Sequence, residues 1–305
     1  MRTRRNLPLF DGAVSYLEWE GPRGAPLLVF LHANGFNAET YVSILGPLAS
    51  QFRIIAPDLR GHGSTTLRAD PREGNWTIFR DDLIAFVDKL GLRPDVLAGH
   101  SMGATASLLA AGKRRDIAQA LVLAEPVLQP DRLVAYAAYA RATGQEDKLM
   151  MRVASTKRRR AHFGSREEAF KSYLGRGAFR TWPESMVADY LKGGLVARGG
   201  GFGLACAPAW EARLYSIFPF GLARLGVRVP VTMLLATEQS SANADVVASI
   251  ARRNRRTRLL TVPGTTHFLP MEKPETLRRE ILNAKSENRD EILPAAAPPS
   301  SPLVE

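Results

Sequence analysis

The segment Gly99-His100-Ser101-Met102-Gly103 places a serine hydroxyl between two glycines. A serine in this pattern can act as a nucleophile when it lies on a tight turn between a strand and a helix, because the turn exposes its hydroxyl. The glycines fit such a turn, since a Cβ at either position would clash with the neighbouring strand or helix. The pattern alone is a weak signal, and a glycine-rich structural turn with an idle serine is the alternative.

The residues around this serine predict the strand and the helix that a nucleophile needs. Residues 95–98 form an apolar run of strand type, and residues 104–111 form a helix of small residues that can pack close to a sheet. The N-terminus of that helix offers the Met102 amide and a partial positive charge to an oxyanion. This context favours a nucleophilic Ser101 over a structural turn.

Strands and helices alternate along the first 125 residues and again near the end of the chain. Continuous apolar runs such as 27–31 are typical of parallel strands that are buried on both faces. The alternation predicts an α/β fold with an open, mostly parallel sheet and right-handed crossovers. We expect strands at 14–18, 27–31, 52–56, 120–124, 231–236 and 259–262, and helices at 76–90, 244–253 and 274–282.

A different pattern separates these two parts. From about residue 128 to 222 the periodicity is helical, aromatic residues are frequent and no good strand is visible. We interpret this block as a helical cap inserted into an α/β core, which divides the chain into 1–128, 129–222 and 223–283. Residues 284–305 end in a stretch rich in Pro, Ala and Ser, and we expect them to form a disordered tail.

Four motifs in a fixed order connect this chain to a known family. They are Leu31-His32-Ala33-Asn34-Gly35-Phe36, Pro57-Asp58-Leu59-Arg60-Gly61-His62-Gly63-Ser64, Gly99-His100-Ser101-Met102-Gly103-Ala104 and Pro263-Gly264-Thr265-Thr266-His267-Phe268. In these motifs the chain resembles an α/β-hydrolase, over about residues 12–128 and 223–283. The resemblance implies the α/β-hydrolase fold and a serine-type hydrolase that needs neither cofactor nor metal.

The family resemblance also implies a histidine that takes the proton of Ser101, and the chain has five histidines. His267 follows the last expected strand, where this fold delivers its histidine, and it keeps the chain order serine, acid, histidine. The other four suit the role less well. His32 and His62 lie in turns of the first two motifs, His100 points away from the adjacent serine, and His162 lies beside a basic run.

The acid that orients the histidine has several candidates. Most relatives carry an aspartate just after the strand at 231–236, but this loop reads Ala236-Thr237-Glu238-Gln239-Ser240-Ser241. The family's other placement is after the strand before the cap, where Glu125 ends an apolar run. A buried glutamate is costly unless it is paired, and catalytic groups gather at the carboxyl ends of strands. We therefore favour Glu125, with Glu238 as the alternative and Asp245 or no acid remaining open.

Two backbone amides are expected to bind the oxyanion of a tetrahedral intermediate. Met102 supplies one, and the loop after residues 27–31 supplies the other, most simply from Asn34, with Ala33 or Gly35 still open. Phe36 and His100 are candidate substrate-binding residues. About a third of the cap's aromatic residues are expected to face substrate, and they are drawn from Tyr136, Tyr139, Phe163, Tyr173, Phe179, Trp182, Tyr190, Trp210 and Tyr215.

Composition narrows the possible partners. The net charge is +11, but the basic runs at 157–160 and 252–256 lack the interleaved aromatic residues of a nucleic-acid surface, so we expect no nucleic-acid partner. We interpret Arg158–Arg160 as a solvated face rather than as a carboxylate site. We find no apolar run of membrane-spanning length and no secretion signal, and Cys206 is the only cysteine. These features predict a cytoplasmic protein without membrane contact, monomeric or homodimeric.

The sequence therefore predicts a serine hydrolase that cleaves a carboxylic ester, lactone or thioester of a small, uncharged and fairly apolar compound. A carbon–carbon bond hydrolase, a cofactor-free perhydrolase and a non-catalytic small-molecule receptor stay open. Epoxide hydrolases and haloalkane dehalogenases resemble the chain but use a carboxylate nucleophile, whereas position 101 is a serine.

Overall fold

The computed structural model describes residues 1–72 and 75–290, and an eight-stranded sheet forms its centre. The strand order is β1-β2-β4-β3-β5-β6-β10-β11. The pairs β1–β2 and β2–β4 are antiparallel, and all the other neighbouring pairs are parallel. This confirms the predicted mostly parallel sheet. The strands are β1 (Arg2–Leu9), β2 (Gly12–Trp19), β3 (Leu27–Leu31), β4 (Arg53–Pro57), β5 (Val96–His100), β6 (Ala120–Ala124), β10 (Val231–Ala236) and β11 (Thr257–Val262).

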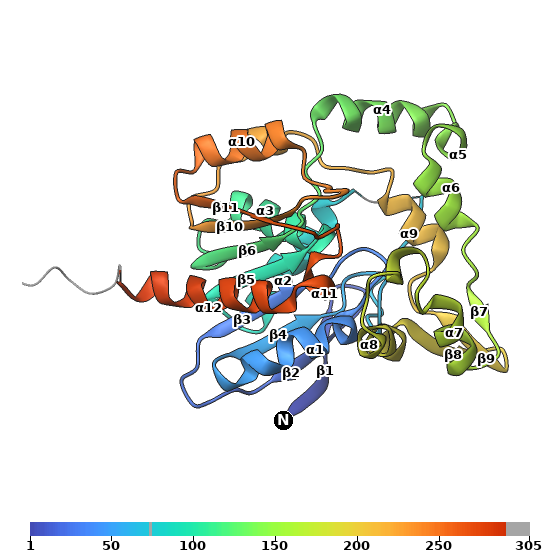
Figure 1. Ribbon diagram of the computed structural model, residues 1–305, viewed down its shortest axis with the longest axis horizontal. Coiled ribbons are helices and arrows are strands. Elements are labelled where there is room, and N and C mark those ends of the chain that lie inside the picture. The colour runs from blue at the N-terminus through green and yellow to red at the C-terminus, as the bar shows by residue number, and fades with distance from the viewer. Residues whose placement is uncertain (73–74, 291–305) are drawn as a thin grey trace, which may run out of the picture.

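Helices cover both faces of this sheet (Figure 1). Successive side chains of a strand point to opposite faces, so alternate residues of β3 enter two different apolar cores. Val29 belongs to the first core and Phe30 to the second. The first core includes side chains of α2 (Thr77–Lys89), α3 (Met102–Lys113) and α10 (Ala244–Arg253). The second includes α1 (Val42–Leu45) and α12 (Pro274–Asp290). The short helices η1 (Ala38–Tyr41), η2 (Gly46–Ser50), η4 (Leu222–Arg224) and α11 (Leu269–Glu272) complete these layers.

The segment between β6 and β10 forms an inserted region at one side of the sheet (Figure 1). Most of it is helical, as predicted, but it also contains a three-stranded antiparallel sheet of order β7-β9-β8 that the sequence analysis missed. Strands of two to four residues, two of them joined at Gly199 and Gly200, are too short to show an alternating pattern. The elements are α4 (Asp131–Ala142), α5 (Glu146–Leu149), α6 (Met151–Lys157), β7 (His162–Phe163), α7 (Arg166–Tyr173), η3 (Gly177–Phe179), α8 (Glu184–Gly194), β8 (Leu195–Arg198), β9 (Gly201–Leu204) and α9 (Pro208–Leu214).

Both ends of the chain also differ from the prediction. β1 was not predicted, because its arginines hide the strand pattern; they form ion pairs with buried acids, as Arg4 does with Asp58 at 2.7 Å. α12 continues to Asp290, so residues 284–290, which we had placed in the tail, are helical. The remainder of the expected tail, 291–305, lies outside the described residues. Within residues 1–72 and 75–290, no helix combines the length and apolarity needed to cross a membrane.

Candidate active site

Ser101 occupies a strained turn between the end of β5 and the start of α3. Its backbone has φ 55° and ψ −118°, a conformation that costs a non-glycine residue about 1–3 kcal/mol. The flanking glycines allow the close approach: a Cβ on Gly103 would lie 2.3 Å from the Leu31 carbonyl oxygen, and one on Gly99 would lie 2.7 Å from the Ala104 nitrogen. The strand, turn and helix expected around this serine are therefore present.

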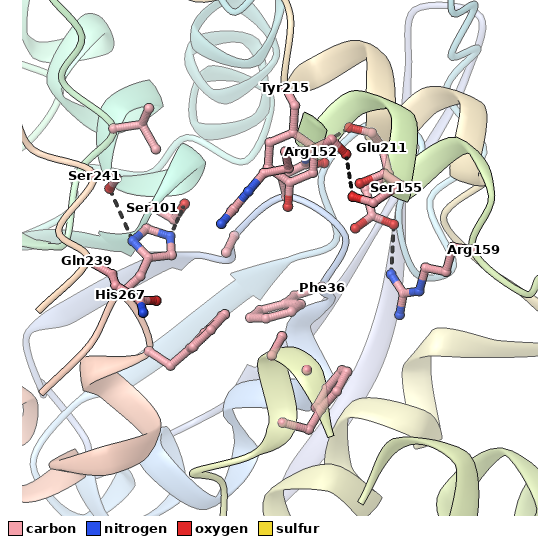
Figure 2. A pocket seen from close by; sticks show the side chains of 18 of the residues that line it. Phe36, Ser101, Arg152, Ser155, Arg159, Glu211, Tyr215, Gln239, Ser241 and His267 are labelled. Atoms are coloured by element: carbon pink, nitrogen blue, oxygen red, sulfur yellow. Dashed lines mark hydrogen bonds and ion pairs between the residues drawn. The ribbon is translucent and has the colours of Figure 1, made fainter. Parts of the chain in front are cut away.

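His267 contacts the serine and two further groups. It lies in the loop between β11 and α11, and its Nε2 is 2.9 Å from Ser101 Oγ. On the other side of the ring, Nδ1 is 3.2 Å from Glu125 Oε2 and 3.1 Å from Ser241 Oγ. Figure 2 shows the ring between Ser101 and Ser241, at one end of a pocket. An imidazole held in this way can accept the serine proton at Nε2 while Nδ1–H donates to the groups behind it.

Glu125 ends β6 as a fully buried carboxylate with φ 47°. Oε1 accepts hydrogen bonds from the Ala236 amide at 2.6 Å and the Ser240 hydroxyl at 2.9 Å, and Oε2 accepts one from the Ser241 amide at 3.0 Å. Burial opposes ionisation of this carboxyl, but the hydrogen bonds from His267, Ala236 and Ser241 outweigh it and lower its pKa. The carboxylate is therefore ionised and oriented toward the histidine.

The alternative acids do not lie at the histidine. Glu238 and Asp245 are both exposed, and neither makes a hydrogen bond to His267 among the described residues. The loop after β10 contributes Ser240 and Ser241 instead, which bind the Glu125 carboxylate. No role was predicted for these two serines, although they stand in the loop where most relatives carry an aspartate.

The amides proposed for an oxyanion site are distinguished by their hydrogen bonds. The Ala33 amide donates to Tyr41 Oη at 3.2 Å, and the Gly35 amide donates to His62 Nε2 at 3.0 Å. Within the part of the chain that the structure describes, the Asn34 and Met102 amides have no acceptor. The Asn34 side chain is engaged elsewhere, since its Nδ2 donates to the Glu211 carbonyl at 3.0 Å. Of the three amides left open in the loop, Asn34 is thus the one available to a ligand.

A buried chain of hydrogen bonds joins this loop to the histidine loop through His100. The ring Nε2 of His100 donates to the His267 carbonyl oxygen at 2.8 Å, so Nδ1 must accept from the Tyr41 hydroxyl at 2.7 Å. Burial, with the nearby His267, lowers the pKa of His100 well below its usual range, which fits this neutral form. His100 does not line the pocket, and this corrects the expectation that it contacts substrate.

Two further histidines brace the same loop in neutral form. His32 donates from Nδ1 to the Ala33 carbonyl and accepts the Leu59 amide at Nε2, while His62 donates to the Arg60 carbonyl and accepts the Gly35 amide. Burial lowers the pKa of His32 to about 4. Burial and the neighbouring His32 lower that of His62 to about 3. These rings support the loop and stay uncharged near neutral pH.

A cavity of about 750 Å³ opens above Ser101, between the carboxyl ends of the strands and the inserted region. This volume suits a small molecule. Phe36 lines it, as predicted, and so do three of the nine aromatic residues considered in the inserted region: Tyr173, Phe179 and Tyr215. Arg152, Arg159 and Arg176 also line it, so the expectation of an uncharged, fairly apolar ligand does not match the walls of this pocket.

Possible metal ligands do not gather in one place within residues 1–72 and 75–290. Across the described ranges, no group of three or more His, Cys, Asp and Glu side chains is placed to hold a metal ion. The single cysteine, Cys206, is buried, and burial raises the pKa of its thiol well above the usual range.

Comparison with known proteins agrees with this architecture. The model of one family, described as the alpha/beta hydrolase family, matches residues 28–280. A 2-(acetamidomethylene)succinate hydrolase of Mesorhizobium japonicum is 25% identical over 264 residues, which cover 85% of this chain and 87% of that protein. An sn-1-specific diacylglycerol lipase of Mus musculus is 26% identical over 285 residues, covering 89% and 83%.

Solved structures show the same fold. The crystal structure of an E-2-(acetamidomethylene)succinate hydrolase superposes with a TM-score of 0.75 at 20% identity, covering 94% of this chain and 100% of that one. A thioesterase domain from the curacin biosynthetic pathway gives a TM-score of 0.73 at 21% identity, covering 92% and 99%.

Proposed function

Because the chain belongs to the alpha/beta hydrolase family, we propose that it is a serine hydrolase of a carboxylic ester, lactone or thioester, with Ser101, His267 and Glu125 as its catalytic residues. One observation carries this proposal: Ser101 Oγ lies 2.9 Å from His267 Nε2, while the buried Glu125 carboxylate binds the other ring nitrogen. A nucleophile, a base and an orienting acid in this sequence form the arrangement that acyl transfer requires.

The proposed reaction has two halves. Ser101 Oγ attacks the substrate carbonyl carbon as its proton passes to His267 Nε2, and the Asn34 and Met102 amides bind the resulting oxyanion. Collapse of this intermediate breaks the bond to the leaving group, which takes the proton from His267. A water molecule then loses a proton to His267 and attacks the acyl-enzyme, which releases the acid and regenerates Ser101.

The relatives support hydrolysis more firmly than any one substrate. By their names, two of the relatives that match over most of their length act on a succinate derivative and on a diacylglycerol. Carbon–carbon hydrolysis and perhydrolysis use the same three residues and remain alternatives, as does a receptor that binds without turnover. We also propose that residues 129–222 act as a cap over a core of residues 1–128 and 223–283.

The test is covalent labelling with a fluorophosphonate, followed by intact-mass analysis and peptide mapping. We expect one adduct on Ser101 in the wild type and none in Ser101→Ala. A screen of p-nitrophenyl esters and acyl thioesters then separates an enzyme from a receptor, because a receptor would show labelling without turnover. A folded wild type that takes no label would contradict the proposal.

A further inference from the structure

We infer that Arg152 forms an anion-binding subsite inside the cavity, so that the preferred substrate carries a carboxylate away from the bond that is cleaved. This inference rests on the proposed function, because it names a substrate class for the same site. Arg152 lies on α6 of the inserted region and lines the same cavity as Ser101 and His267. In Figure 2 its side chain extends from the inserted region into the pocket, on the side where Ser101 and His267 lie.

The arginines of the cavity differ in how their charge is balanced. Arg159 donates to the Glu211 carboxylate at 2.7 Å, to the Tyr190 hydroxyl at 2.6 Å and to the Tyr173 hydroxyl at 3.2 Å. Its charge is therefore neutralised within the protein, and its nitrogens are already bonded. Arg159 thus holds the inserted region together and has little left for a ligand.

Arg152 has no such acid. Among the described residues, no carboxylate lies within ion-pair distance of its guanidinium, which lies 5.3 Å from the ring centre of Tyr215. A guanidinium held over an aromatic ring still has N–H groups that can bind a planar anion. Arg176, from the turn before η3, also lines the cavity, and it has no acid partner among the described residues.

The charge of the cavity follows from this pairing. The charges of Arg159 and Glu211 cancel each other. The charges of Arg152 and Arg176 are not balanced in this way, so they make the walls of the cavity positive. A carboxylate matches a guanidinium in charge and in its two-pronged geometry, although both arginines are also accessible to solvent. The cavity therefore favours an acyl or leaving group that ends in a carboxylate over a neutral group of the same size.

A matched pair of substrates tests this preference. p-Nitrophenyl hemiglutarate carries a free carboxylate, and its methylamide replaces that group by a neutral one of similar size. We expect wild-type kcat/KM to be at least 10-fold higher for the acid. Arg152→Met should lower kcat/KM for the acid by roughly 10- to 100-fold, mainly through KM, and change the amide by less than about twofold.

Two control variants separate a specific contact from general charge. Arg158→Met removes the same charge from an exposed residue that lies just beyond the end of α6 and does not line the cavity, so its acid-to-amide ratio should equal that of the wild type. Arg152→Lys should retain part of the preference. Equal ratios in the wild type and Arg152→Met, or an equal loss in Arg158→Met, would overturn the inference.

Labelling of Ser101 keeps this test independent of the proposed function. If neither ester turns over but the fluorophosphonate still labels Ser101, glutarate and glutaramide serve as protecting ligands. Glutarate should slow labelling of the wild type and not of Arg152→Met, and glutaramide should slow neither. A concentration of about 50 mM glutarate is enough to occupy even a site with a millimolar dissociation constant. If labelling proceeds at its normal rate at that concentration, the subsite is refuted while the serine hydrolase proposal stands.

Discussion

His267 Nδ1 lies 3.2 Å from Oε2 of Glu125, a carboxylate that reaches the histidine from the end of β6 and not from the loop after β10. β6 and β10 are hydrogen-bonded neighbours, with Ala124 opposite Leu234, so the two strand ends lie side by side. An acid from either strand can therefore reach the same ring. In this chain the loop after β10 supplies the serines that hold the Glu125 carboxylate.

Removal of the Glu125 charge should impair catalysis far more than removal of the Glu238 charge. We expect Glu125→Gln to lower kcat by roughly 100- to 10,000-fold, because the amide does not stabilise the charged imidazole. Steady-state kinetics on any ester that the wild type hydrolyses measures this effect. Glu238→Gln, at an exposed position, should stay within about twofold of the wild type. The reverse order would exclude Glu125 as the acid.

An acid at position 241 should partly replace Glu125. Ser241 Oγ already lies 3.1 Å from His267 Nδ1, so Glu125→Gln with Ser241→Asp should recover at least about 10-fold in kcat over Glu125→Gln alone. The matched control is Ser240→Asp in the same background, because the Ser240 hydroxyl binds Glu125 and not the histidine. Equal recovery by both aspartates would show that only net charge matters.

Loss of the Tyr41 hydroxyl should weaken both loops at the serine. Tyr41→Phe leaves the buried Ala33 amide and His100 Nδ1 without their partner, which should lower the free energy of unfolding by about 1–3 kcal/mol. We expect kcat to fall about 10-fold with little change in KM, since the Asn34 and His267 backbones lose their alignment. Tyr139→Phe, on an exposed helix face, is the control for urea unfolding and kinetics. An unchanged kcat in Tyr41→Phe would refute the link.

Stability should decrease as the pH falls from about 6.5 toward 4. His32 and His62 have lowered pKa values in the folded protein, about 4 and about 3, so they stay neutral there while the unfolded chain takes up protons. Their contribution is complete above the unfolded pKa of about 6.5, and each lowers the free energy of unfolding by up to about 1.4 kcal/mol per pH unit below it.

Urea unfolding at a series of pH values measures this slope. His62→Gln should make the slope shallower, whereas His162→Gln, at an exposed position, should leave it as in the wild type. A wild-type stability that stays constant between pH 6.5 and 4.5 would contradict the neutral, buried state of these rings.

The close contact beneath the serine predicts a large effect of one methyl group. Gly103→Ala would place its Cβ 2.3 Å from the Leu31 carbonyl oxygen, so α3 must move away from β3. We expect the free energy of unfolding to fall by about 2–4 kcal/mol. We also expect most of the fluorophosphonate labelling of Ser101 to be lost. Gly46→Ala has open space around its Cβ and a φ of −51°, and thermal unfolding should show a change of less than about 1 kcal/mol.

The sequence by itself determined the fold class and which residues are candidates for the site. Buried strands such as Leu27–Leu31 carry a continuous apolar run, and the turn around Ser101 needs glycines at fixed spacing, so both are visible in a local window of the chain. β7, β8 and β9 were missed because such short pairings leave no periodic signal. β1 was missed because its charges are balanced by acids distant in the sequence.

Only the tertiary structure decided how the candidates are arranged and what the pocket can bind. The choice of Asn34 over Ala33 and Gly35 depends on which amides are already bonded, and their partners Tyr41 and His62 lie elsewhere in the chain. Arg152 and Arg159 look alike in sequence and both line the cavity, yet Glu211 neutralises only Arg159. Hydrogen-bond and charge pairing are properties of residues brought together by folding, so no local pattern can specify them.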